Sequence, residues 1–464
     1  MTQTVGGGVH ELRAAMEGAV VTPEDAEYDQ ARLLWNADAD HRPAVVARCG
    51  STADVVAAVR YAQAEELEIA VRCGAHSMSG QSGVDGGIVV DLSGMREVTV
   101  DPTRKRARAG GGALLSDLDA ATQAHGLAVP SGMVGHTGIG GLTLGGGMGW
   151  LTRQAGLAID NLESVEIVVA DGRVLRASEQ ENPDLFWAVR GGGGNFGVVT
   201  EFEYRLHEVG PMVQFAFLFW EVERGAEALR AIRAAVPELP RSCNVILGAL
   251  DAPPAPFVPA EHRFQTGIAL MISGFGDPDE HAEAVDRLRE ALPPLFDAVT
   301  PMPYTALQQL FDQANCWGQY YYEKSTRHAE LTDEVIEVVI SHLSRRRSPM
   351  SVMLAYYLGG AYCEADPDAT AFGGTREPQW VTFVLAIAPD AEVLAADRAG
   401  WSRAMADALQ PFALDAGTYV NGMAEQDDRR VRAAYGKKYE RLARIKADYD
   451  PGNVFHRNIN IKPA

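Results

Sequence analysis

The sequence predicts a protein of mixed helices and strands that is divided into two domains. The chain has 464 residues, more than one compact core usually holds. Over the first 200 residues, short strand patterns alternate with helical ones. From about residue 208 the glycine-rich loops become rarer, and strand patterns such as 213–219 alternate with helical patterns such as 279–292. An amphipathic helix through Lys446 and a turn at 449–453 follow, and we expect this tail to return to the first domain.

The elements of the first domain follow from local signals. Residues 43–48 have the pattern of a strand, and Ser51 provides a capping signal for a helix that ends near Ala64. Residues 69–72 are predicted to form a strand that runs directly into a loop at 73–80. The next predicted elements are a buried strand at 87–92, a pair of strands around 101–102, a helix at 114–125, strands at 164–170 and 173–177 joined by a turn at Asp171-Gly172, and a half-buried strand at 198–205.

Charge and composition narrow the range of partners. The formal net charge is −21, whereas phosphate binding requires a basic face, so nucleic acid is not an expected partner. No stretch approaches the roughly 18 consecutive apolar residues of a membrane span, and the N-terminus lacks the basic start and apolar core of a signal peptide. The five cysteines are scattered, which fits neither a disulfide framework nor a CxxC metal pair. We expect a soluble cytoplasmic protein; its oligomeric state is not indicated.

Three glycine-rich loops lie within 125 residues, at 73–80, 131–150 and 191–197. Glycine has no Cβ and permits positive φ, so successive backbone N–H groups can point at phosphate oxygens. The alternative is that these are three tight turns without a ligand. Residues 192–197 match the dinucleotide fingerprint GxGxxG literally, but that fingerprint requires a strand before it and a helix after it. Here a helix-like segment precedes and a strand follows, so a nicotinamide-binding Rossmann domain is not predicted.

His76 is the most informative single residue. It lies in the first glycine-rich loop, where no amphipathic pattern would bury it. A neutral imidazole is a good nucleophile and can add to an electrophilic carbon of a bound cofactor. A loop histidine can equally be a structural or surface group, and the same alternative holds for His136 in the second loop. The histidines show no HExxH or comparable ligand spacing, so no metal is predicted.

The chain resembles, nearly from end to end, the FAD-linked oxidases of the berberine-bridge-enzyme type, which have the vanillyl-alcohol-oxidase (PCMH-type) FAD-binding fold. Residues 72–77, RCGAHS, resemble the family loop R-x-G-G-H-S, whose histidine carries the flavin through its 8α-methyl carbon. Residues 131–150 resemble the second flavin loop, and 191–200 resemble the segment GGGGNFGVVT. The tail from Tyr435 to Phe455, which contains YDPGNVF, resembles the C-terminal signature of the family.

The resemblance implies an α+β fold with two domains. Residues 1–207, together with 411–464, are expected to form the FAD-binding domain. Residues 208–410 are expected to form a substrate-binding domain in which an antiparallel sheet is covered by helices. FAD is the implied cofactor, with a single covalent link through His76. The other implied cofactor contacts are Arg72, Cys73, Gly74, Ala75, Ser77, Met78, Ser79, Gly80, Gln81, Ser82, Gly132, His136, Thr137, Gly138, Gly140, Gly141, Gly145, Gly149, Val198, Asn458 and Asn460.

Four departures from the family pattern matter. Many relatives attach the flavin a second time through a cysteine, and Val134 stands at that position here. Ala75 replaces a glycine, which raises the question whether the position needs positive φ. Cys73 replaces a small residue, although a loop that holds both residues favours the histidine as the attachment point. The strand at 352–357, VMLAYY, lacks the carboxylate base that the family often places there.

The resemblance implies an oxidase that transfers hydride from a C–H bond next to an alcohol or amine of a small molecule to the flavin, after which O2 reoxidises the flavin and H2O2 is released. A base must accept the substrate's O–H or N–H proton. Tyr357, Tyr321 and Tyr419 are the candidates, and each would need a pKa well below the ordinary value near 10. Asn421 resembles a position that orients substrate, and Thr137 one that controls oxygen access.

Two alternative functions remain open at this stage. Some bacterial relatives in natural-product pathways use the flavin for oxygenation or oxidative cyclisation. A non-catalytic flavin-binding protein would bind FAD and fail to reduce it with any substrate. The sequence does not identify the substrate, because sugars, nicotine-like amines and polyketide alcohols all serve enzymes of this architecture.

Overall fold

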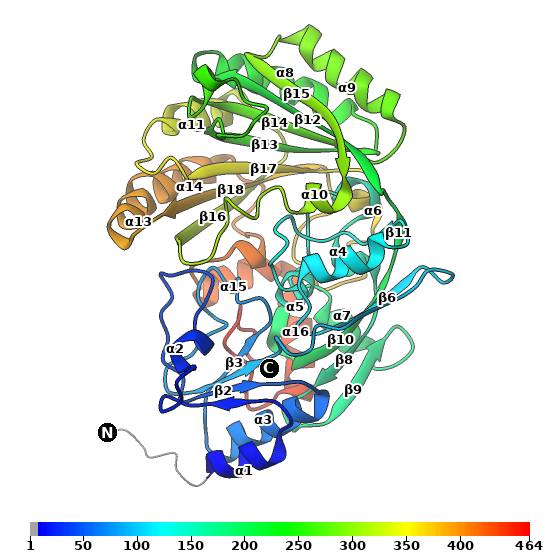
Figure 1. The fold of residues 1–464 in the computed structure, drawn as a ribbon, viewed down its shortest axis with the longest axis vertical. Helices are drawn as coiled ribbons and strands as arrows, with labels where there is room; N and C mark the ends of the chain where they lie inside the picture. Colours follow the sequence, from blue (N-terminus) through cyan, green and yellow to red (C-terminus); the bar gives the residue numbers. More distant parts are fainter. Residues whose placement is uncertain (1–7) are drawn as a thin grey trace.

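The computed structural model describes residues 8–464. Figure 1 shows two halves stacked along the long axis, the lower one built from the beginning and the end of the chain and the upper one from its middle. Helices and sheets are segregated in the upper half, and mixed with short loops in the lower half. The α+β fold predicted from the sequence is confirmed.

The lower half begins with a four-stranded sheet in the order β1-β2-β4-β3. Its strands β2, β4 and β3 are parallel, and α3 (Thr52–Ala64) connects β2 to β3. The side chain of Ser51 accepts a hydrogen bond from the backbone N–H of Asp54, so the predicted N-cap is present. The strands are β1 (Val20–Val21), β2 (Val45–Arg48), β3 (Ile69–Arg72) and β4 (Ile88–Asp91).

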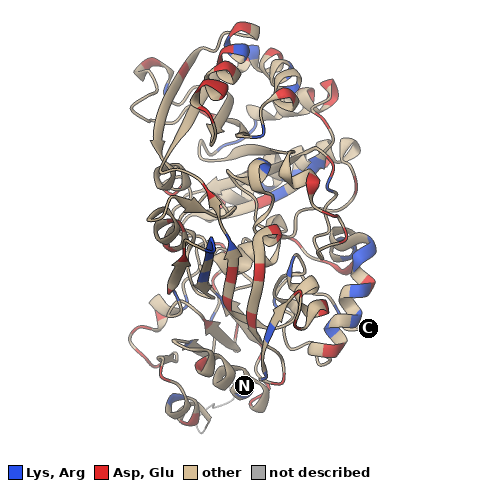
Figure 2. Ribbon diagram, turned by 90° about the vertical axis from the view of Figure 1, so that its right-hand side faces the viewer, with Lys and Arg blue, Asp and Glu red and all other residues tan. Residues whose placement is uncertain are grey.

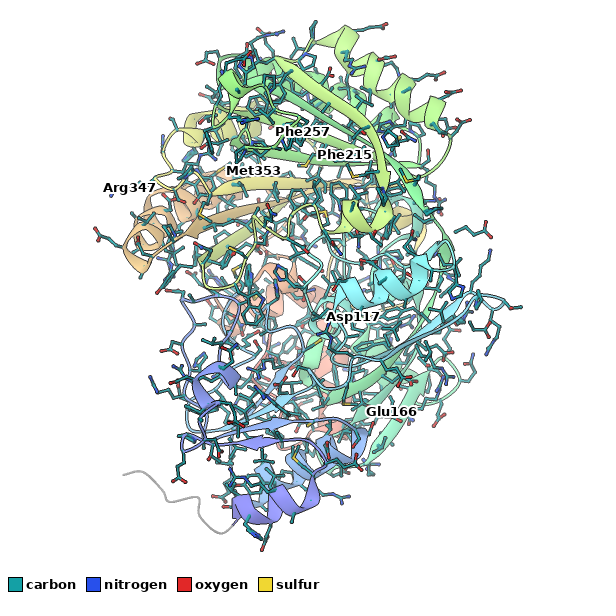
Figure 3. The ribbon with its side chains drawn as sticks, viewed as in Figure 1. Asp117, Glu166, Phe215, Phe257, Arg347 and Met353 are labelled. Carbon is teal, nitrogen blue, oxygen red and sulfur yellow. The ribbon has the colours of Figure 1, made fainter. Side chains whose placement is uncertain are left out.

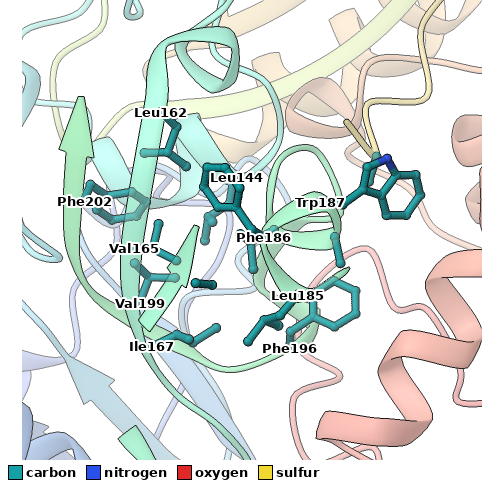
Figure 4. Packing of buried hydrophobic residues seen from close by; sticks show 14 of the residues in the cluster. Leu144, Leu162, Val165, Ile167, Leu185, Phe186, Trp187, Phe196, Val199 and Phe202 are labelled. Carbon is teal, nitrogen blue, oxygen red and sulfur yellow. The ribbon is translucent and has the colours of Figure 1, made fainter. Parts of the chain in front are cut away.

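A five-stranded antiparallel sheet, β5-β6-β10-β8-β9, completes the lower half. Figure 4 shows how Phe202 of this sheet and Phe186 of α7 (Pro183–Val189) enter the same apolar cluster. Side chains point to alternate faces along β10, but the strand is more buried than the half-buried pattern predicted, because Val199 and Glu203 on the expected open face are also buried. The strands are β5 (Val98–Asp101), β6 (Arg106–Gly110), β8 (Leu162–Val168), β9 (Val174–Ser178) and β10 (Val198–Arg205).

The upper half is built on a seven-stranded antiparallel sheet in the order β15-β12-β14-β13-β17-β18-β16. One face packs against α8 (Gly225–Ala235), α9 (Pro278–Ala291), α11 (Asp333–Leu343) and α14 (Ala404–Leu409), and the opposite face is directed toward the lower half. Met353 belongs to the helix-covered face and Phe215 to the opposite one (Figure 3). The strands are β12 (Met212–Glu221), β13 (Cys243–Asp251), β14 (Thr266–Gly274), β15 (Phe296–Pro303), β16 (Tyr320–His328), β17 (Val352–Leu358) and β18 (Gln379–Ala388).

The C-terminal segment packs against the lower half. After α15 (Asp428–Tyr435) and α16 (Tyr439–Tyr449), Phe455 enters the core beneath the parallel sheet. Asn195 of the third glycine-rich loop donates to the carbonyl of Ile459 at 3.0 Å and accepts from the N–H of Ile461 at 2.8 Å. The tail therefore holds the third loop in place, although the two segments are about 260 residues apart in the sequence.

The remaining elements are short. Acidic and basic residues are interspersed along the whole ribbon (Figure 2). Between residues 8 and 464, no helix is long and apolar enough to cross a membrane. The short elements are α1 (Gly8–Ala15), α2 (Tyr28–Ala31), α4 (Leu115–Gln123), β7 (Leu127–Ala128), α5 (Ile139–Leu144), α6 (Thr152–Ala155), β11 (His207–Glu208), α10 (Tyr304–Gln308), α12 (Ala361–Glu364) and α13 (Ala391–Asp397).

Candidate active site

A cavity of about 430 Å³ lies where the lower half meets the open face of the seven-stranded sheet. All three glycine-rich loops contribute to its wall, together with the C-terminal segment around Asn458 and the strands β16, β17 and β18. Such junctions between domains are common places for ligand binding. The loops that were singled out in the sequence are therefore brought together around one space.

The first and second loops meet through their backbones. A Cβ atom at Gly74 would collide with the backbone N of Gly138. Ala75 has φ = +58°, so this position does adopt the left-handed conformation that favours glycine. The loop therefore keeps the backbone conformation of the family glycine, and the methyl group of Ala75 is strained there.

His76 lies at the junction of these loops. Its ring stacks on Trp35 with 4.5 Å between the ring centroids. Its Nε2 lies 2.7 Å from Nδ1 of His136, and its Nδ1 lies 3.4 Å from Oγ1 of Thr137. Burial, with a smaller contribution from His136, lowers the pKa of His76 to about 3. The imidazole is therefore neutral at ordinary pH, the form that can act as a nucleophile.

A contact of His136 favours one tautomer of each ring. Nε2 of His136 faces the backbone carbonyl of Asp312 at 3.5 Å. A carbonyl can only accept, so His136 carries its proton on Nε2 and presents an unprotonated Nδ1 to His76. His76 then donates from Nε2, which leaves its own Nδ1 unprotonated, with the hydroxyl of Thr137 at 3.4 Å as its neighbour.

The structure brings together most of the predicted cofactor-binding residues. Those that line the cavity are Cys73, Gly74, Ala75, His76, Ser77, Met78, Ser79, Gln81, Ser82, Gly132, Thr137, Gly138, Gly140, Gly141, Gly145 and Asn458. Those outside its wall are Arg72, Gly80, His136, Gly149, Val198 and Asn460. Two residues of the second group support the cavity wall from outside. Arg72 forms an ion pair with the buried Asp91 below the first loop, and His136 forms a hydrogen bond with His76.

Unpaired polar atoms along the wall show whether a dinucleotide fits. Ser82 Oγ, Asn458 Oδ1 and Arg457 Nε are buried and have no hydrogen-bond partner within residues 8–464. A buried polar group without a partner costs about 1–3 kcal/mol, and the phosphates and hydroxyls of FAD would satisfy these groups. Arg457 was missed in the sequence, where it stands next to the predicted Asn458. The wall therefore fits FAD.

The sheet contributes an apolar wall with one carboxyl group. Leu354 and Tyr356 of β17 and Phe383 of β18 line the cavity. Glu323 of β16 lies among them, and its side chain is 7% exposed. Burial raises its pKa to about 8. This acid was missed because it lies on a different strand from the one on which a base was expected.

Two of the three tyrosines proposed as bases do not reach the cavity. Tyr357 lies on the helix-covered face of β17, 5.1 Å from Trp380 between ring centroids. Tyr321 stacks on Trp35, and its hydroxyl donates to the carbonyl of Cys316 at 2.6 Å. Burial raises the pKa of both hydroxyls, which is the opposite of what a base requires. The structure gives neither of them a part in proton transfer.

Tyr419 and Asn421 do line the cavity. The hydroxyl oxygen of Tyr419 accepts from the N–H of Gly147 and from Nδ2 of Asn421, each at 2.9 Å. Burial raises the pKa of Tyr419 to about 12, so this hydroxyl is a proton donor. Cys73 also lines the cavity, and burial raises the pKa of its thiol to about 11, which makes it an inert neighbour of His76.

Comparison with known proteins agrees with this geometry. Residues 43–178 match the family described as FAD binding domain, and residues 418–462 match the family described as berberine and berberine like. The (R)-6-hydroxynicotine oxidase of Paenarthrobacter nicotinovorans is 30% identical over 97% of this chain and 97% of its own length. An FAD-linked oxidoreductase of Dictyostelium discoideum is 29% identical over 98% of this chain and 97% of its own.

Solved structures show the same architecture. The crystal structure of 6-hydroxy-D-nicotine oxidase from Arthrobacter nicotinovorans has a TM-score of 0.86 at 29% identity, with 97% of this chain and 98% of that chain covered. The berberine-bridge-enzyme-like protein 1 of Physcomitrella patens has a TM-score of 0.87 at 22% identity, with 98% and 99% covered, and supports the fold alone. The chain belongs to the berberine-bridge-enzyme-like family and is an FAD-linked oxidoreductase.

Proposed function

We propose that this protein is an oxidase that holds FAD covalently through His76 and removes a hydride from the carbon next to an alcohol or amine of a small molecule. O2 then takes up the two electrons, and H2O2 is released. The proposal depends above all on the position of His76, a neutral and buried imidazole in the wall of the 430 Å³ cavity. The proposal assigns FAD to residues 1–207 and 411–464, and the substrate to residues 208–410.

The attachment atom in this proposal is Nδ1 of His76. Nε2 is occupied by its short hydrogen bond to His136, whereas the unprotonated Nδ1 has only the long contact of 3.4 Å with the hydroxyl of Thr137. Bound FAD would offer its methyl carbon to Nδ1 of His76, and O2 would be the oxidant for the attachment. His136 receives the proton of His76 Nε2, because its unprotonated Nδ1 is 2.7 Å away.

The bound flavin supplies a two-electron acceptor. Ser82, Arg457 and Asn458 hold the cofactor through the polar atoms that they leave unpaired. Leu354, Phe383 and the other apolar side chains of the sheet exclude water from the reacting carbon. Thr137 stands beside His76 and controls the space that O2 must cross.

The first experiment is the intact mass and visible spectrum of the purified protein after acid denaturation. FAD mass and yellow colour that stay with the protein, and are lost in His76→Ala, support the covalent link. His10→Ala, on α1 far from the cavity lining, is the matched control and is expected to keep both. A colourless wild-type protein of bare-chain mass after incubation with FAD would remove the proposed attachment.

The second experiment distinguishes an oxidase from an oxygenase. Turnover under labelled O2 is expected to leave the label in H2O2 and none of it in the organic product. Incorporation of the label into the product would replace the oxidase proposal by an oxygenase one.

A further inference from the structure

The carboxyl group of Glu323 is buried in the cavity without a partner. Glu323 is buried, with only 7% of its surface exposed. Within residues 8–464, its carboxyl group forms no hydrogen bond or ion pair within the ordinary distance limits. Buried carboxylates are normally paired or hydrogen-bonded. A free one in a ligand cavity indicates that the ligand supplies the missing partner.

The groups around Glu323 do not supply a cation. Tyr356 on β17 and Tyr419 are the titratable groups that interact with it electrostatically. Lys324 is paired with Glu425 at 2.8 Å, and Arg327 on the same strand is paired with Asp415 at 2.7 Å. The cations carried by β16 are therefore already neutralised.

The backbone next to Glu323 is adapted to its carboxyl group. A Cβ atom at residue 422 would collide with Oε1 of Glu323, so glycine at this position leaves room for the carboxyl. Phe383 also lies close to the same point, since it too would approach that Cβ, at 3.0 Å. The carboxyl group thus occupies a defined place between an aromatic ring and the 419–423 segment.

We infer that the substrate is a small, apolar amine whose ammonium group pairs with Glu323 and is surrounded by the rings of Tyr356, Phe383 and Tyr419. This inference rests on the proposed oxidase function. Aromatic faces attract cations, and Leu354, Leu385 and Met148 complete an apolar surround. A sugar would need several polar partners, and the sheet wall offers one carboxyl and one tyrosine hydroxyl among leucine and phenylalanine side chains.

Glu323 also accounts for the proton that an amine must lose. The ammonium N–H bond breaks and its proton passes to the carboxylate, which leaves a neutral amine with a lone pair. Hydride then leaves the adjacent carbon for the flavin, and the lone pair forms the C=N bond of an iminium product. O2 accepts the two electrons, and water hydrolyses the iminium after release. The raised pKa of Glu323 suits this task, because a group near the working pH both accepts and returns a proton.

The test uses FAD-loaded protein and two probes of equal shape. Benzyltrimethylammonium carries the charge, and neopentylbenzene is its neutral counterpart; binding is followed by the change in the flavin spectrum. In the wild type, the affinity for the cation is expected to rise by about tenfold between pH 7 and pH 9, as a carboxyl with a pKa of about 8 ionises. The affinity for the neutral probe is expected to stay constant.

Glu323→Gln is expected to abolish the pH dependence and the preference for the cation. Glu97→Gln, the same change at an exposed position outside the cavity, is expected to behave as the wild type. Gly422→Ala, which displaces the carboxyl without removing it, is expected to weaken cation binding at pH 9. If Glu323→Gln does not fold, the pH dependence of cation binding to the wild type is the test. A cation affinity that does not change between pH 7 and pH 9 would then contradict the inference.

Catalysis gives a second measurement. Under anaerobic conditions N-methylbenzylamine is expected to reduce the flavin, and benzyl alcohol and xylobiose are not. Equal affinity for both probes at pH 9, or reduction by the alcohol or the sugar without the amine, would overturn the inference. Failure of the proposed function is distinguishable, because it appears as protein without covalent FAD before any probe is added.

Discussion

Nε2 of His76 donates to Nδ1 of His136 across 2.7 Å, and the pair continues to the carbonyl of Asp312. The direction of this chain is set by its end, because the carbonyl can only accept. It leaves Nδ1 of His76 unprotonated, beside the hydroxyl of Thr137, and provides an acceptor for the proton on Nε2. We therefore expect His136 to position the residue proposed to carry the flavin and to accept its proton.

His136→Ala is expected to slow covalent attachment of FAD by roughly 100-fold, the usual contribution of a positioned base, while reversible FAD binding persists. The rate is measured as the fraction of protein with added mass after timed incubation of apoprotein with FAD. His125→Ala, at an exposed position, is the control. Unchanged attachment in His136→Ala would show that the hydrogen bond has only a structural part.

Glu323 is expected to make the protein less stable as the pH rises. Its folded-state pKa, about 8, is above the ordinary value of 4.5, so the folded protein keeps a proton that the unfolded chain releases. Stability from this group is complete below about pH 4.5 and is lost as the pH rises through 8. The difference in Tm between Glu323→Gln and the wild type should therefore shift in favour of the variant as the pH rises from 5 to 9. The change in stability is equivalent to a few kcal/mol at most. A constant difference in Tm across this range would argue against the raised pKa.

The fold could be predicted largely because its signals are local. The Ser51 cap and the Asp171-Gly172 turn each involve only a few neighbouring residues, and each is present in the structure. The strand β10 is also present, but both of its faces are more buried than the sequence alternation predicted. The glycine-rich loops could be located in the same way, whereas their role in holding FAD follows from the family resemblance and stays a prediction. Their convergence on one cavity depends on close backbone contacts, such as that of Gly74 with Gly138, which leave no pattern beyond the glycines themselves.

The substrate side could not be predicted in this way. Tyr356 and Tyr357 are adjacent, and strand alternation sends one to the cavity and the other to the helices; both faces of β17 are apolar, so the sequence does not say which is which. Glu323 lies on β16, which is separated from β17 by β18 in the sheet but precedes both in the chain. A crossover of this kind places an acid in the site from a strand that sequence order does not associate with it.

The pair Tyr356→Phe and Tyr357→Phe tests this assignment of faces. Both changes remove one hydroxyl from the same strand. Tyr357→Phe is expected to leave flavin reduction unchanged, since its ring packs against Trp380 away from the cavity. Tyr356→Phe is expected to raise the KM for an amine several-fold, because Tyr356 lines the cavity together with Glu323 and its hydroxyl is close enough to interact with the carboxyl electrostatically. Rapid-mixing measurement of flavin reduction separates the two, and a larger effect at residue 357 would reverse the assignment.

Ala75 offers a gain in stability. At φ = +58°, the methyl group of Ala75 costs about 1–2 kcal/mol relative to glycine. Glycine in turn loses more conformational entropy on folding than alanine, which offsets about 0.5–1 kcal/mol of this difference. Ala75→Gly is expected to stabilise the protein by up to about 1 kcal/mol. Gly80→Ala, at φ = +74° and with its Cβ 2.6 Å from that of Ala39, is expected to destabilise it. Urea unfolding measures both, and a loss of stability in Ala75→Gly would mean that the methyl group makes a packing contribution larger than its strain.

Lys446 is expected to be the most sensitive residue of the C-terminal segment. Its ammonium group is fully buried, pairs with Asp450 at 2.6 Å, and donates to the carbonyls of Asn195 and Phe455. These bonds join α16, the third glycine-rich loop and the end of the chain. Lys446→Met leaves the carboxylate of Asp450 buried and unpaired, which costs about 3–5 kcal/mol in comparable cases.

Lys462→Met is the matched control, because Lys462 pairs with Asp428 at the same distance of 2.6 Å on the exposed surface of the same segment. An exposed pair contributes about 0–1 kcal/mol, so this variant should unfold within about 1 kcal/mol of the wild type. Asp450 also accepts hydrogen bonds from the N–H groups of Val454 and Phe455, so the loss of Lys446 disturbs this part of the tail. Because Lys446 also holds the third glycine-rich loop through Asn195, Lys446→Met should lose non-covalent FAD faster in the His76→Ala background. Equal free energies of unfolding for the two lysine variants would show that the tail is held by its apolar contacts, and that the buried pair contributes little to the third glycine-rich loop.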